Sequence, residues 1–312
     1  MTKIKPAKKT TKKDQQPNPI ADNTKLKLKL VWSEIKTEYD RVLKNSAKNV
    51  KAQGFRKGKT PLKIVEGKLG KEQLINKVLE TLIPPRYEKL IKKEGKQPLT
   101  QPQINPISME WNKDWELEIQ IAEKPIIKLG NYQKSVKKGL KMALKQLKEQ
   151  KSQPTKNAKG KKEKPTQKQI SAREKEAKLH QIFKALVEDI QPQIPELLLK
   201  EETKREIQRL AKELERIGLS LDDYLTRRNQ KFEEMSSQLA AQTLGQLQLE
   251  FVLREIEEIV KIKITEQDKK AELDKIKDQK LKKQIENNPH YLEHLVKQIS
   301  RRKLIDQLLE IK

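Results

Sequence analysis

Hydrophobic and polar positions follow two different periods in the first third of the chain. Residues 25–31 and 115–122 place an apolar side chain at every second position, which is typical of strands in a sheet with one face in water. Residues 33–51, 62–69 and 72–94 repeat their apolar side chains at helical spacing instead. This mixture predicts a compact α+β unit.

Turn and boundary residues mark where these elements end. Pro61 suits the first turn of a helix and Gly70 ends it. Pro84 and Pro85 fall inside the helix expected over 72–94, so a kink or break is expected there. Residues 112–114 have turn chemistry between a strand-like run at 107–111 and the strand that starts at Trp115. We expect all three tryptophans to pack in the core of this sheet rather than to stack on nucleic-acid bases: Trp32, Trp111 and Trp115.

The chain from about residue 171 onward has helical periodicity throughout. Proline, glycine and capping residues divide it into several helices, some of them long. The expected boundaries are Pro195, Gly218, Ser220, Thr265 and Pro289. Paired carboxylates such as Asp222 with Asp223 or Glu257 with Glu258 are explained by capping and helix-surface charge rather than by general acid–base work. These patterns predict an all-α domain.

Two lysine-rich segments lack a clear pattern. Residues 1–22 are rich in Lys, Thr, Gln and Pro, which predicts a disordered basic arm, either a solvated tail or one that clings to RNA. Residues 132–170 contain lysine, glutamine and scattered proline, with no aromatic after Tyr132, and predict a linker or a frayed helix. The expected division is therefore a basic arm, an α+β domain at 23–131, the linker, and a helical domain at 171–312.

Composition and charge narrow the function classes. Of the 312 residues, 37% are charged and 4% aromatic, which predicts an elongated molecule with long solvated helices rather than one large core. The formal net charge of +26 predicts attraction to polyanions without sequence specificity. Cysteine is absent, so disulfides and cysteine-based zinc sites are excluded. No apolar run reaches membrane-spanning length and residues 1–11 lack a signal-peptide core, so we expect a cytoplasmic protein.

One short loop combines backbone freedom, an aromatic ring and cations. It lies between the helices expected at 33–51 and 62–69. Its arginine can grip a phosphate or carboxylate with two hydrogen bonds, its lysines add diffuse charge, its phenylalanine can enter an apolar crevice, and its glycines let the backbone approach a target. The candidate binding residues are Gly54, Phe55, Arg56, Lys57, Gly58, Lys59 and Pro61.

This loop matches in full the consensus Gly-Phe-Arg-x-Gly-x-x-Pro, the ribosome-docking signature of the bacterial trigger factor family, which the chain resembles. The elements on either side of the loop extend the resemblance over about the first third of the chain. The second half is similar through weaker marks in the same order: Ile194-Pro195, Gly218-Leu219-Ser220, Tyr224-Leu225 and Ile262 to Thr265. The resemblance implies an α+β ribosome-binding domain followed by an elongated all-α domain with long helical arms.

The resemblance also implies a function. It predicts an ATP-independent, ribosome-associated chaperone that binds nascent polypeptides at the exit tunnel, with protein and RNA near the tunnel as partners and no membrane. It leaves open whether free molecules form weak homodimers. The alternative from another class is a basic RNA-binding or ribosome-assembly scaffold with coiled-coil helices.

Most family members carry a prolyl isomerase domain of the FK506-binding type at the position of residues 132–170. Some forty residues without β-pattern or aromatics cannot form its proline pocket, so we predict no isomerase activity; isomerase chemistry without the usual domain remains a third reading. No cofactor is expected, because no glycine-rich phosphate loop follows a strand. No metal site is expected either, because His290 and His294 lack a third ligand and His180 stands apart.

Overall fold

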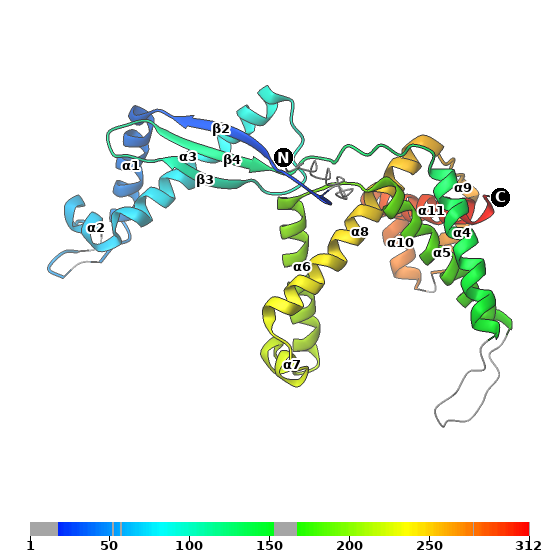
Figure 1. The fold of residues 1–312 in the computed structure, drawn as a ribbon. Helices are drawn as coiled ribbons and strands as arrows, with labels where there is room; N and C mark the ends of the chain where they lie inside the picture. The colour runs from blue at the N-terminus through cyan, green and yellow to red at the C-terminus, as the bar shows by residue number, and fades with distance from the viewer. Residues whose placement is uncertain (1–17, 52, 57, 153–166, 277, 312) are drawn as a thin grey trace, which may run out of the picture. The chain divides into compact units, whose positions relative to one another are not determined.

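The computed structural model describes residues 18–51, 53–56, 58–152, 167–276 and 278–311. They are mostly helical, with a small sheet region (Figure 1). The chain divides into two units, each made of separate stretches of sequence. One contains residues 21–124 and 195–205, and the other contains residues 125–194 and 206–312 with the segment up to Ile20. Residues 1–17, on which the basic-arm prediction mainly depends, lie outside the described residues.

A three-stranded antiparallel sheet forms the centre of the first unit. The strands β2 (Thr24–Leu30), β3 (Gln103–Ser108) and β4 (Trp115–Ile121) lie in the order β2-β4-β3 (Figure 1). The register pairs Thr24 with Ile121 and Leu30 with Trp115. The two alternating strands are thus confirmed. The strand-like run at 107–111 overlaps the third strand only at its first two residues, since that strand starts at Gln103 and ends at Ser108.

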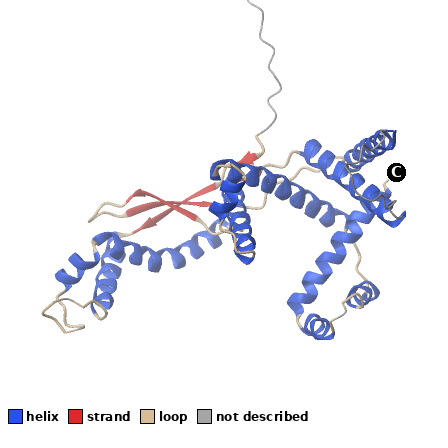
Figure 2. Ribbon diagram, turned by 90° about the horizontal axis from the view of Figure 1, so that it is seen from below, coloured by secondary structure: helices blue, strands red, loops and turns tan. Residues whose placement is uncertain are grey.

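The period of two in the sequence separates a charged face of this sheet from an apolar one. Lys25, Lys27 and Lys29 stand opposite Gln120, Glu118 and Glu116, so cations meet carboxylates across two of the three pairs. The alternate side chains are buried against helices that run along the sheet (Figure 2). The buried strand residues of this core are Leu28, Leu30, Trp115, Leu117, Ile119 and Ile121.

Three helices complete this part of the first unit: α1 (Trp32–Ala47), α2 (Leu62–Leu69) and α3 (Lys71–Glu94). Helix α3 continues past Pro84 and Pro85 and ends at Gly95, whose φ of 61° is left-handed. The helix therefore does not break at the prolines, and the kink expected as the other outcome stays a prediction. Apolar side chains beyond the prolines, including Leu90 and Ile91, pack on the sheet core and offset the hydrogen bonds that proline cannot donate.

The three tryptophans differ in their surroundings. Trp115 is fully buried and its indole donates a hydrogen bond to the Glu110 carbonyl at 3.1 Å. Trp32 packs against the same core, so core packing is confirmed for both. The prediction is wrong for Trp111, which is 44% exposed in the turn after β3. Its ring lies edge-on to Trp32 at 4.8 Å and to Tyr39 at 5.0 Å between centroids.

The second unit begins with a pair of packed helices, α4 (Tyr132–Ser152) and α5 (Gln167–Ile190) (Figure 1). Of the two predicted alternatives, a linker or a frayed helix, the structure has a helix over residues 132–152, and this helix is packed. Val136, Gly139 and Ala143 are buried against the neighbouring helix, and this spacing of three and four residues is a helical stripe. Because lysines occupy many of the positions between them, this helical pattern of small apolar residues is difficult to recognise in the sequence. Residues 153–166 lie outside the described part.

The remaining elements follow the predicted boundaries closely. They are β1 (Ile20–Ala21), which pairs with β5 (Ile194–Pro195), and α6 (Glu196–Arg216), α7 (Leu221–Arg227), α8 (Phe232–Val260), α9 (Glu266–Leu273), α10 (Gln279–Asn287) and α11 (Pro289–Glu310). Ser220 and Thr265 cap α7 and α9 by accepting from the amides of Asp223 and Asp268. Pro289 stands in the first turn of α11. Helix α10 was not predicted.

The core of the second unit contains residues from α4, α5, α8 and α11: Val136, Ile182, Leu186, Val252, Leu253, Ile256, Leu304 and Leu308, with Leu129.

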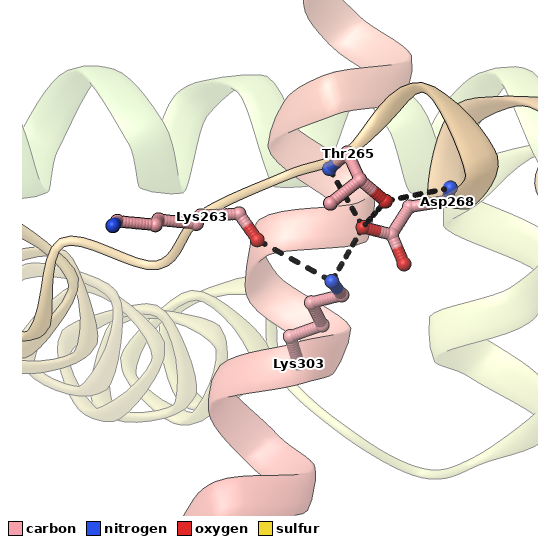
Figure 3. Close-up of polar contacts among 4 residues, drawn as sticks. All are labelled: Lys263, Thr265, Asp268 and Lys303. Atoms are coloured by element: carbon pink, nitrogen blue, oxygen red, sulfur yellow. Dashed lines mark hydrogen bonds and ion pairs between the residues drawn. The ribbon is translucent and has the colours of Figure 1, made fainter.

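A polar cluster joins the start of α9 to α11. The Lys303 ammonium donates to the Asp268 carboxylate and, at 3.3 Å, to the Lys263 carbonyl (Figure 3). Together with hydrogen bonds from Thr265, it lowers the pKa of Asp268 to about 2. None of the helices in the described ranges has the length and apolarity that crossing a membrane requires.

Candidate functional site

The candidate site is the loop between α1 and α2, residues 54–61. Gly54 and Gly58 have φ of 82° and 83°, a conformation that disfavours any side chain. Directly after Gly58, the Lys59 amide donates back to the Arg56 carbonyl at 2.9 Å. The two glycines therefore define the shape of the loop.

Contacts behind the loop hold its two ends. The Pro61 carbonyl accepts from the amides of Ile64 and Val65 at 3.0 and 3.1 Å, and the Val65 side chain is fully buried in the sheet core. The Lys68 ammonium reaches back across the loop to the Lys51 carbonyl. The loop thus starts and ends on a packed base.

A hydrogen bond between the flanking helices supports the same base. The Tyr39 hydroxyl on α1 donates to the Glu66 carboxylate on α2 at 2.9 Å. Burial, and then this carboxylate, raise the pKa of Tyr39 to about 12. The tyrosine therefore stays neutral and keeps donating over the whole physiological range.

The side chains at the tip of the loop face solvent. Phe55 is 41% exposed, and Arg56 and Lys59 are exposed as well. Neither cation has an ion-pair partner among the residues that the structure describes. An exposed aromatic ring beside a free guanidinium can contact protein and phosphate at the same time.

The charge around the loop has a single sign. The sequence contains no Asp or Glu between Asp40 and Glu66. The same stretch carries Arg41, Lys44, Lys48, Lys51, Arg56, Lys57, Lys59 and Lys63. A run of this kind produces a positive potential that attracts polyanions.

The structure brings most of the predicted residues together in this loop: Gly54, Phe55, Arg56, Gly58, Lys59 and Pro61. Lys57 lies outside the described residues. Sequence reasoning missed Leu62 and Ile64 at the start of α2, which are apolar and exposed. The signal was present, because the first four positions of this short helix hold three apolar residues and cannot all face the core.

The histidines form no comparable site in the described residues. His290 and His294 lie on α11, and His294 lines a cavity of about 270 Å³ with Tyr291 and Glu272. No group of three potential metal ligands exists among the residues that the structure describes.

The fold and the loop define a class: a basic, mainly helical binding protein with a cationic tip presented on an α+β base. Comparison with known sequences specifies the family. The sequence model of the family described as bacterial trigger factor protein matches residues 12–149. The model of the bacterial trigger factor C-terminus matches residues 156–310. The chain belongs to the bacterial trigger factor family.

Similar proteins agree with this assignment. The chain is 40% identical over 99 residues to the trigger factor of Streptococcus pneumoniae strain Hungary19A-6, and equally to that of strain CGSP14. These matches cover 32% of this chain and only 23% of the relatives' length. A solved structure described as "Promiscuous Substrate Recognition in Folding and Assembly Activities of the Trigger Factor Chaperone" aligns with a TM-score of 0.59, over 96% of this chain and 99% of that one. At 14% identity this likeness shows the fold.

Proposed function

We propose that this protein is an ATP-independent, cytoplasmic chaperone that docks on the ribosome through residues 54–61 and shields nascent polypeptides with its helical domain. The observation that carries the proposal is the exposed Phe55–Arg56 tip, which stands on a packed base inside a stretch without carboxylates. Arg56, Lys57 and Lys59 would contact phosphate or carboxylate groups near the tunnel. Phe55 would enter an apolar crevice of a ribosomal protein, while Gly54, Gly58 and Pro61 shape the loop.

Exposed apolar side chains in the second unit support the chaperone part of the proposal. Ile217 is 74% exposed, and Phe232 and Ile259 are also exposed. Unfolded polypeptides bind to accessible apolar surface of this kind. These three residues are candidate client contacts.

We further propose that the protein lacks prolyl isomerase activity. The two matched family models leave only residues 150–155 between them. Helices α4 and α5 occupy most of residues 132–170, the position of the isomerase domain in other family members. A proline-limited refolding reaction should therefore keep its rate when catalytic amounts of the protein are added. A faster reaction would contradict this part of the proposal.

Ribosome co-sedimentation of the triple variant Phe55→Ala, Arg56→Ala, Lys57→Ala tests the docking role. Binding should be lost almost completely at moderate salt, because one loop makes the specific contact. The matched control is Arg227→Ala, Lys231→Ala, Phe232→Ala, which removes the same three residue types from exposed positions near α7 and α8. The control should bind like the unchanged protein to ribosomes that carry no nascent chain, so that the candidate client contact Phe232 plays no part in the comparison.

Equal, modest weakening in both variants would refute docking through the loop and favour the scaffold alternative, in which many cations share the contact. The chaperone part needs its own assay. The unchanged protein should suppress aggregation of an unfolded client without ATP. A scaffold protein need not do so.

A further inference from the structure

Helix α4 carries a row of lysines on one face, which we call the lysine stripe: Lys134, Lys137, Lys141, Lys145 and Lys148. Their spacing of three, four, four and three residues puts them within an arc of about 80° on a helix of 3.6 residues per turn. The stripe is about 21 Å long at 1.5 Å per residue. All five side chains are exposed.

The opposite face of α4 is occupied by the packing against α5. A Cβ atom placed on Gly139 would come within 2.6 Å of the Ile182 Cα atom, so the two backbones nearly touch. Val136 and Ala143 are fully buried on this side. The stripe therefore points away from α5 and is not covered by it.

The stripe is only weakly neutralised. Within the described part of the chain, one ion pair involves a stripe residue, Lys145 with Glu149 at 4.0 Å. Lys134 lies in the field of Asp189, whose hydrogen-bonded partner is Lys138. Like charges four residues apart oppose helix formation by about 0.2–0.5 kcal/mol per pair. The stripe thus costs stability that an anionic partner would restore.

Helix α6 has the same length and is also rich in charge, but it neutralises itself. Lys200 pairs with Glu196, Arg205 with Glu202 and Arg209 with Glu206. A high charge content in this chain therefore does not by itself produce an unpaired row. Of these two helices, α4 is therefore the one with charge left for a partner.

We propose that the lysine stripe binds the phosphate backbone of RNA, at a site separate from the loop at residues 54–61. Lysine ammoniums are point charges that suit phosphates in any orientation. A row of them about 21 Å long matches the regularly repeated charges of a phosphate backbone. A helix that lies on a lipid surface inserts its apolar face, but the buried apolar side chains of α4, Val136 and Ala143, face α5 instead. No aromatic side chain follows Tyr132 along the helix, so the binding does not depend on base sequence.

The test compares two variants of the full chain. The stripe variant is Lys137→Gln, Lys141→Gln, Lys148→Gln, which leaves the Lys145 ion pair in place. The control is Lys200→Gln, Lys204→Gln, Lys212→Gln on α6, all exposed positions. Both remove three charges, and glutamine keeps the helix propensity of lysine. Far-UV circular dichroism verifies that both variants fold.

The measurement is the fluorescence anisotropy of a labelled RNA duplex between 50 and 200 mM salt. Three lost phosphate contacts should lower the slope of log affinity against log salt by about 2 to 3. The unchanged protein should therefore lose about 16- to 64-fold more affinity over this range than the stripe variant does. The α6 control should keep the original slope to within about one unit.

Three results would overturn the proposal. An equal change of slope in both variants would mean that RNA binding is spread over the whole surface. A stripe variant that binds RNA normally but loses a polyglutamate peptide would make the stripe an acidic-peptide site. Loss restricted to phosphatidylserine vesicles would make it a membrane contact. Because the loop at residues 54–61 is intact in both variants, failure of this test leaves the ribosome-docking proposal unaffected.

Discussion

The contact between α4 and α5 at Gly139 predicts an unusual effect of a small substitution. Gly139→Ala adds one methyl group. The new Cβ atom would lie 2.6 Å from the Ile182 Cα atom and 2.7 and 2.9 Å from the Gln181 carbonyl oxygen and carbon. Normal contacts of this kind lie at 3.4–4 Å, and all three neighbours are backbone atoms. The helices must therefore move apart by about 1 Å.

Two opposing effects determine the change in the free energy of unfolding. Replacing glycine by alanine inside a helix stabilises it by about 1 kcal/mol. Overpacking a tight contact costs about 1–3 kcal/mol, and a backbone neighbour, which cannot rotate away, puts the cost at the upper end. We expect Gly139→Ala to destabilise the protein by about 1–2 kcal/mol.

Gly245→Ala is the matched control. Gly245 is a helical glycine in α8 with no atom within 4 Å of its added Cβ. That variant should gain about 0.5–1 kcal/mol. The two substitutions are identical in chemistry, but their effects should have opposite signs and differ by about 1.5–3 kcal/mol.

Urea unfolding followed by circular dichroism at 222 nm measures both variants. Tryptophan fluorescence serves as an internal reference, because Trp32, Trp111 and Trp115 all belong to the unit of residues 21–124. The fluorescence transition should be less affected than the helical one by the Gly139 variant. An unchanged or higher stability of Gly139→Ala would refute the close helix contact.

Two further predictions concern pH. Tyr39→Phe removes the hydrogen bond to Glu66 and should lower the free energy of unfolding by about 1 kcal/mol at pH 7. Because the pKa of Tyr39 is raised to about 12 in the folded protein, the tyrosine of the unfolded chain ionises first as the pH rises. The advantage of the unchanged protein over the variant should therefore shrink from pH 10 to about 12. An advantage that is constant over this range in fluorescence-monitored unfolding would contradict the buried contact. Asp268→Asn should lower the stability of the protein at pH 7. Since the pKa of Asp268 is lowered to about 2 in the folded protein, the difference in stability between the unchanged protein and the variant should be present above pH 4 and vanish as the pH falls towards 2. A difference that persists at pH 2 in acid unfolding would rule out the ion pair with Lys303.

Much of the fold could be predicted where local chemistry determines structure. The alternation in β2 and β4 and the caps at Ser220 and Thr265 depend on neighbours in the sequence, and the structure confirms them. The sequence of helix α4 predicts only a linker or a frayed helix, because its small buried residues gain their stability from α5. Helix α3 passes through two prolines because tertiary packing outweighs their local cost. Long-range contacts of this kind leave little trace in the sequence.

The candidate site also has a part that the sequence predicts and a part that it does not. The loop at residues 54–61 was predicted, because glycine, arginine and proline at fixed spacing carry both shape and chemistry. The base behind it was not, since the bond from Tyr39 to Glu66 joins residues on two helices. The lysine stripe was also missed as a unit. Its residues could be placed on one face only after the segment was found to be a helix with its other face covered.

The interrupted sequence of the first unit has a consequence for the protein's own synthesis. Residues 195–205 belong to the same unit as residues 21–124, and the Leu197 amide donates to the Asn23 side chain at 2.8 Å. A translating chain reaches residue 195 about 4 to 14 s after residue 124, at 5–20 residues per second. During that interval the sheet and its helices exist without their final segment. The growing chain must therefore tolerate an unfinished domain while the intervening helices are made.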